Sequence, residues 1–74
     1  MKHLIMGVPK GEDFPSFEKQ IPITTTKLKL IMGWEKDEDS LHDYRLSEQQ
    51  ITSIEKACSL DLPKNLDLFL TTYE

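Results

Sequence analysis

The 74-residue sequence is poor in cross-linking residues, with one cysteine, Cys58, and two histidines. A single cysteine excludes an internal disulfide, and no Cys/His set stands at the spacing of a zinc site. No apolar run approaches the roughly 18 to 20 residues of a membrane-spanning helix, and the N-terminus lacks the core of a signal peptide. We therefore expect one cytoplasmic domain, residues 1–74, which holds no metal or cofactor and is stabilised by packing alone.

Basic residues are also scarce, since nine Lys and Arg stand against thirteen Asp and Glu, for a net charge of -4. An acidic protein repels phosphates, so nucleic acid is not an expected partner. Without a long apolar run, a membrane is not an expected partner either. Cys58 with His3 and His42 would be the nucleophilic set, but Cys58 falls on the apolar stripe of a helix, where thiols serve packing. A chain this small also has little interior for a catalytic pocket. The sequence predicts a binding protein without enzymatic activity.

Strand patterns dominate the first two thirds of the chain. Met1–Val8 reads as a strand, and Phe17–Ile23 as a second one that Pro22 confines to a sheet edge. Lys27–Leu46 reads as a hairpin, because apolar and other residues alternate up to a charged turn and the pattern resumes at Leu41. The alternating residues are Leu28, Leu30, Met32 and Trp34.

A short repeat links two of these segments. Leu4-Ile5-Met6-Gly7 recurs as Leu30-Ile31-Met32-Gly33, with similar charges a few residues beyond each copy. An internal duplication would explain the repeat, and so would chance similarity between two strand-turn segments.

Helical signals begin at Ser47. Ser47-Glu48-Gln49-Gln50 fits a capping box, and Ile51, Ile54 and Cys58 downstream of it share one stripe. After Pro63 the spacing of Leu62, Leu66, Phe69, Leu70 and Tyr73 favours a second helix, and a strand with Leu66, Leu68 and Leu70 on one side is the alternative.

Together these patterns predict an α+β fold, with a small antiparallel sheet of three or four strands followed by one or two C-terminal helices packed on one face. The apolar faces of the strands and of the helix can be buried only by packing against each other. The expected core is Leu28, Leu30, Met32, Leu46, Ile51, Ile54 and Cys58.

Charge is distributed unevenly along the chain. Between Glu35 and Glu48 there are six acidic and two basic residues, so the whole net charge lies in this segment. Trp34 and Tyr44, aromatic types enriched at interface hot spots, adjoin it. An acidic docking surface for a basic partner is one interpretation, and a solubilising turn is the other. The candidate partner-binding residues are Trp34, Glu35, Asp37, Glu38, Asp39, Asp43, Tyr44 and Glu48.

The stretch from Leu30 to Leu41, followed by Tyr44-Arg45-Leu46, resembles the opening hairpin of small bacterial immunity proteins encoded beside polymorphic toxins, including toxins of contact-dependent growth inhibition. The later stretch Leu46–Glu55, with Leu62-Pro63 and Phe69-Leu70, is similar to the helical start of the SMI1/KNR4-like (SUKH) family, which includes many such proteins. Both resemblances imply a non-catalytic immunity protein that binds and neutralises a cognate toxin.

Because the segment between Glu35 and Glu48 is acidic, we expect the toxin to be a basic nuclease domain. A protein of a different class is the alternative, namely a small structural or adaptor subunit that self-associates through the Phe17–Ile23 sheet edge.

Overall fold

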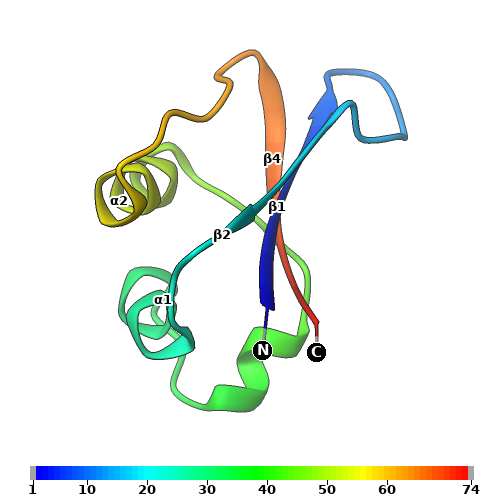
Figure 1. Cartoon of the computed structure of the whole chain (residues 1–74). Helices are drawn as coiled ribbons and strands as arrows, with labels where there is room; N and C mark the ends of the chain where they lie inside the picture. The colour runs from blue at the N-terminus through cyan, green and yellow to red at the C-terminus, as the bar shows by residue number, and fades with distance from the viewer. Residues whose placement is uncertain (1, 74) are drawn as a thin grey trace.

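The computed structural model describes residues 2–73, except for the side chain of Asp37. Figure 1 shows a twisted sheet with both α-helices on one of its faces and nothing helical on the other. The predicted α+β class is therefore confirmed. In chain order the elements are β1 (Lys2–Pro9), β2 (Phe17–Ile21), α1 (Thr25–Met32), the 3-10 helix η1 (Asp37–Leu41), β3 (Tyr44–Arg45), α2 (Glu48–Cys58) and β4 (Leu66–Tyr73).

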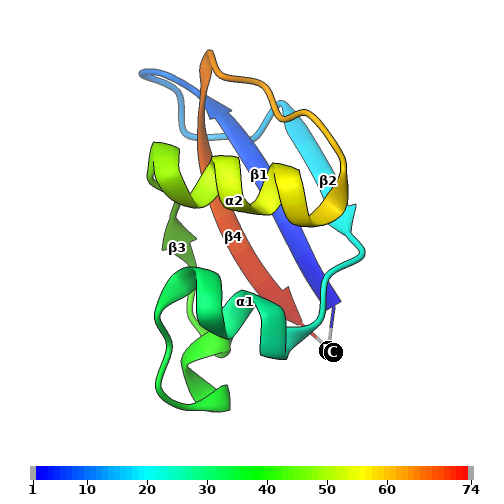
Figure 2. The same cartoon turned by 90° about the vertical axis from the view of Figure 1, so that its left-hand side faces the viewer.

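All neighbouring strands are antiparallel, and their order across the sheet is β2-β1-β4-β3. β1 and β4 form the centre, where they pair along their full length from Lys2–Tyr73 to Pro9–Leu66. The expected strand at residues 1–8 is thus confirmed from Lys2 onwards, and β2 lies at a sheet edge as predicted. Figure 2, viewed from the helical side, shows α1 and α2 crossing in front of the central strands.

The predicted hairpin over residues 27–46 is wrong, because Thr25–Met32 forms helix α1. The hydroxyl of Thr24 accepts a hydrogen bond from the Lys27 amide at 3.2 Å and caps the first turn. Gly33 ends the helix in the left-handed region, at a φ of 74°, where a glycine is least strained. Both caps were visible in the sequence, and the apparent alternation of apolar residues obscured them.

The rest of the expected hairpin is also replaced. The charged turn forms the 3-10 helix η1, and β3 has only two residues, which pair with Leu70 and Phe69 of β4. The first resemblance was to a hairpin, and this segment does not form one. The repeated tetrapeptide is β-strand at residues 4–7 and the end of a helix at residues 30–33, so the two copies are not structurally equivalent.

Helix α2 is confirmed with its capping box. The Ser47 hydroxyl accepts from the Gln50 amide at 3.2 Å, and the Gln50 side chain accepts from the Ser47 amide at 2.9 Å. The favoured helix after Pro63 is wrong, because Leu66–Tyr73 is strand β4, the alternative interpretation. Consequently the helices do not come after all the strands in the sequence. Helix α1 follows β2, and α2 stands between β3 and β4.

The core lies between the helices and the sheet. Leu28, Leu46 and Ile54 are buried as predicted, and Met32, Ile51 and Cys58 are half-buried against the same cluster. The prediction that Leu30 is buried is wrong, since 82% of this residue is exposed. A helix turns about 100° per residue, so Leu30 points away from the face that carries Leu28. The sheet contributes residues that the expected core omitted: Ile5, Ile21, Leu68 and Leu70.

Candidate partner-binding surface

The acidic segment lies on the surface around η1, at one end of the sheet (Figure 2). Glu35, Glu38 and Asp43 are exposed. Asp37 falls within η1, and its side chain lies outside the described part of the structure. The exposed carboxylates therefore concentrate negative charge on a short stretch of surface between α1 and β3.

Asp39 has a different role from these exposed acids. Its carboxylate accepts hydrogen bonds from the backbone amides of Glu35 and Lys36, each at 3.2 Å. Its backbone oxygen accepts the Tyr44 hydroxyl at 2.5 Å. Asp39 thus fixes the shape of the turn, and less of its charge is available to a partner.

Two aromatic residues adjoin the same turn. The centroids of Trp34 and Tyr44 are 5.4 Å apart, with a 43° angle between the planes, and His42 meets the edge of Tyr44 at 6.4 Å. Only 9% of Trp34 is exposed, so it belongs to the core and offers a partner little contact area. Tyr44 is half-buried. The two rings pack against each other, and the Tyr44 hydroxyl bonds to Asp39 of the acidic turn.

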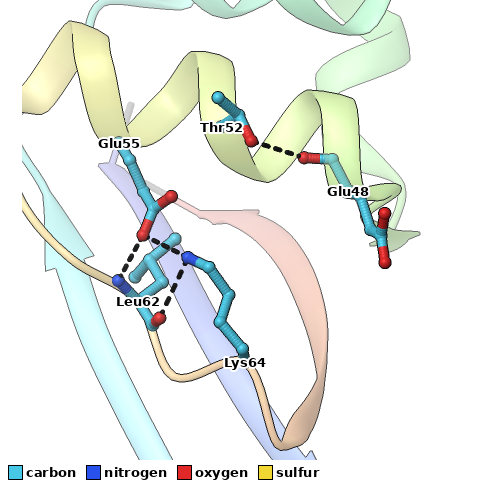
Figure 3. Close-up of polar contacts among 5 residues, drawn as sticks. All are labelled: Glu48, Thr52, Glu55, Leu62 and Lys64. Carbon is cyan, nitrogen blue, oxygen red and sulfur yellow. Dashed lines mark hydrogen bonds and ion pairs between the residues drawn. The ribbon is translucent and has the colours of Figure 1, made fainter.

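Glu48 is exposed but separate from the other predicted acids. It is the first residue of α2, which β3 separates from η1 (Figure 2). In Figure 3 its carboxylate extends away from the helix, while its backbone oxygen accepts the Thr52 hydroxyl at 3.0 Å. It adjoins a shallow hollow of about 460 Å³ that is also lined by Lys10, Arg45 and Lys64. Because it lies at the start of α2, apart from η1, Glu48 does not extend the acidic surface.

Two of the cations around this hollow are themselves paired. Arg45 lies 3.0 Å from the Asp67 carboxylate, and Lys64 is paired with Glu55. Glu55 also accepts the Leu62 amide at 2.7 Å, which fixes the connection from α2 to β4 (Figure 3). These bonds to Lys64 and Leu62 hold the pKa of Glu55 below its ordinary value. The bonds of Glu55 make this side of the hollow a structural joint between α2 and β4.

The residues considered for nucleophilic chemistry are occupied in other ways. His3 is buried and bonded through its two ring nitrogens to the hydroxyls of Thr72 and Thr25, at 2.9 and 3.0 Å. Cys58 packs against the core, and burial raises the pKa of its thiol, which disfavours the reactive thiolate. His42 is exposed on Tyr44. These contacts give each residue a structural role.

One surface escaped the sequence analysis, namely the sheet face opposite the helices. Leu4, Met6 and Val8 of β1 and Phe69 of β4 are half-buried on this side. A signal for it was present, because strands covered on both faces read as nearly continuous apolar runs, and Leu4–Val8 contains no polar residue. The surface was missed because Phe69 was placed on a helix.

Within residues 2–73, no group of three or more His, Cys, Asp or Glu side chains is arranged to hold a metal ion. No helix in this part of the chain has the length and apolar character needed to cross a bilayer. Comparison with known protein families, curated proteins and solved structures finds no match for the chain.

Proposed function

We propose that the protein is a non-catalytic, cytoplasmic immunity protein that binds and neutralises a cognate bacterial toxin, namely a basic nuclease domain. The observation that carries the proposal is the concentration of the whole net charge between Glu35 and Glu48, with Glu35, Glu38 and Asp43 exposed on a braced turn. The similarity of the capped helix at Leu46–Glu55 to immunity proteins of the SUKH family supports the same role.

The acidic turn would act in two stages. At long range its negative potential attracts a basic domain and speeds encounter, an effect that weakens as salt is added. In the complex, these carboxylates form ion pairs with Lys or Arg side chains of the toxin that would otherwise bind phosphates. The toxin therefore loses access to nucleic acid. The hydrogen bonds of Asp39 and the Trp34–Tyr44 pair hold the turn in one shape, which lowers the entropy lost on binding.

The experiment measures association with the protein encoded by the neighbouring gene, which the proposal requires to be the toxin. Replacing Glu35, Glu38 and Asp43 together by Lys should slow association about tenfold or more at low salt, with a smaller effect on dissociation. The salt dependence of the association rate should shrink in the same variant.

The matched control reverses three exposed acids outside the segment, Glu12, Asp13 and Asp61, and changes the net charge by the same amount. If only total charge matters, the control slows association as strongly as the test variant, and the proposed surface is wrong. Failure of wild-type protein to bind the neighbouring gene product, or to protect cells that produce it, would refute the immunity role itself.

Protection by binding alone requires no reactive side chain in the immunity protein. Replacing Cys58 by Ala or His42 by Gln should therefore leave cellular protection intact in folded protein. Loss of protection by folded Cys58→Ala, a half-buried site away from the acidic turn, would indicate chemistry that this proposal does not contain.

A further inference from the structure

The sheet face opposite the helices carries an apolar centre that nothing in the described chain covers. Figure 1 shows α1 and α2 on one side of the strands and no helix on the other. The side chains of Leu4, Met6 and Val8 alternate with the buried Ile5 along β1 and therefore point to this uncovered side. Phe69 lies directly opposite Met6 on β4 and shares its face.

This composition is unusual for a sheet face in contact with water. A half-solvated antiparallel sheet normally alternates apolar residues inward with polar residues outward. Here the outward positions of β1, one of the two eight-residue central strands, are instead Leu4, Met6 and Val8 after Lys2. The residues beside them on β4 are Thr71, Phe69, Asp67 and Tyr73. Leu4, Met6, Val8 and Phe69 are half-buried and remain partly accessible on this face. An accessible apolar patch rimmed by polar groups marks an interaction site.

Charged residues stand at the two edges of this face and have opposite signs. The register places Glu18 of β2 beside Met6, Met6 beside Phe69, and Phe69 beside Arg45 of β3. One row across the sheet thus runs from an acid through two apolar residues to a base. The Asp67 carboxylate, 3.0 Å from the guanidinium, ties Arg45 to the outer side of β4.

We propose that two copies of this chain pack face to face through their uncovered sheet faces. The two-fold axis lies between the sheets and runs parallel to the strands. This rotation exchanges the left and right edges of the sheet, so Glu18 of each copy faces Arg45 of the other, and Met6 faces Phe69. An axis across the strands would instead place Glu18 over Glu18 and Arg45 over Arg45. Charge complementarity therefore selects one orientation.

The available area suits a reversible dimer. The two central strands have eight residues, β2 has five and β3 has two. With strands about 4.8 Å apart and about 3.4 Å per residue, the face measures about 370 Å² in plan, or about 750 Å² for two copies. That value is below the range of stable interfaces, so we expect a weak dimer that forms at about 100 μM and above. Twisted sheets pack in this aligned manner at a separation of about 10 Å.

The β2 edge is a poorer route to self-association. Its middle residues Glu18, Lys19 and Gln20 are all exposed and polar, and charged side chains on an edge strand disfavour pairing with another strand. The expected alternative role as an edge-pairing subunit is thus less well supported than pairing through the face. The dimer proposal does not depend on toxin binding, since the acidic turn lies at the end of the strands (Figure 2).

Sedimentation velocity of the purified chain across about 1 to 500 μM tests the proposal. The wild-type mass should rise with concentration from 8.6 kDa towards twice that value. Met6→Lys should remain monomeric, because it places a charge at the centre of the face. The control Leu30→Lys introduces the same charge at an exposed apolar site on α1 and should leave dimerisation unchanged. Circular dichroism verifies that each variant is folded.

A charge swap tests the orientation without disturbing the apolar centre. Glu18→Arg and Arg45→Glu should each weaken dimerisation about tenfold, and the double variant should return to within about threefold of wild type. A wild-type chain that stays at 8.6 kDa at every concentration would overturn the proposal. A dimer that Met6→Lys leaves intact would overturn it as well, and single charge variants without effect would overturn the orientation.

Discussion

His3 makes the folded protein sensitive to mild acid. The ring is 1% exposed and bridges three elements, because its two nitrogens bond to Thr72 on β4 and Thr25 on α1. A neutral imidazole has one N–H donor and one acceptor, and hydroxyl groups can serve either, so both bonds suit the uncharged ring. Burial disfavours the imidazolium and lowers the pKa of His3 below 6.5 in the folded state.

The sign of the pH effect follows from this shift. The unfolded chain takes up a proton near pH 6.5, while the folded chain resists protonation until a lower pH. The contribution of His3 is therefore fully present above pH 6.5 and is lost as the pH falls towards the folded pKa. The loss is at most about 1.4 kcal/mol per pH unit. At about 0.05 to 0.15 kcal/mol per residue, the whole domain has about 4 to 11 kcal/mol, so the decrease is measurable.

Urea unfolding followed by the fluorescence of Trp34, between pH 5.5 and 7.5, measures this effect. Carboxylates titrate mostly below this range. His3→Gln supplies an amide donor and acceptor to the two threonines but does not titrate, so its stability should stay nearly flat between pH 6.5 and 5.5. His42 is retained in both proteins and serves as an internal control. If wild type and His3→Gln lose stability in parallel over this interval, the reasoning about His3 is wrong.

Three further changes test the packing. Ile54→Ala removes a fully buried side chain and should lower the free energy of unfolding by about 2 to 5 kcal/mol, measured by urea denaturation; an unchanged midpoint would show that α2 does not pack on the sheet. Gly7→Ala would place a Cβ 2.7 Å from the Leu66 Cδ1 atom and should cost about 1 to 3 kcal/mol in the same assay, whereas neutrality would mean that Leu66 moves aside freely. Glu55→Ala removes the acceptor for the Leu62 amide and should speed hydrogen exchange at that amide; unaltered exchange would show that the bond does not restrain this connection.

Local signals predicted those elements that carry their own determinants. Helix α2 needed only the Ser47–Gln50 capping box and a stripe of apolar residues, both of which act within a few residues of each other. The strand predicted at Met1–Val8 is found at Lys2–Pro9, and β2 lies at the predicted sheet edge. Alternation, loop-forming residues and Pro22 restrict those segments directly. The acidic surface was predicted as a stretch of sequence, and the structure shows that Glu48 lies apart from the rest of it.

Leu-Ile-Met-Gly shows where local information ends. The same four residues are strand at Leu4–Gly7 and the end of a helix at Leu30–Gly33. The first copy pairs with β2 and β4 on its two sides, whereas the second follows the Thr24 cap and packs Ile31 and Met32 against the core. Helix and strand propensities differ by less than about 1 kcal/mol per residue, so contacts with distant residues decide between them.

Long-range contacts also decided the secondary structure of residues 66–73. Their apolar positions suit a helix stripe and a strand face almost equally, and only the long pairing with β1 selects the strand. That pairing joins the two ends of the chain, so it cannot be seen in any local window. The sequence by itself determined the composition, the acidic segment, the α+β class and the capped helix, because these depend on neighbouring residues. Tertiary structure decided which segments became strands and where the helices fall among them in the sequence. It also placed Phe69 beside Met6 on an uncovered sheet face. Each of these outcomes depends on long-range contacts.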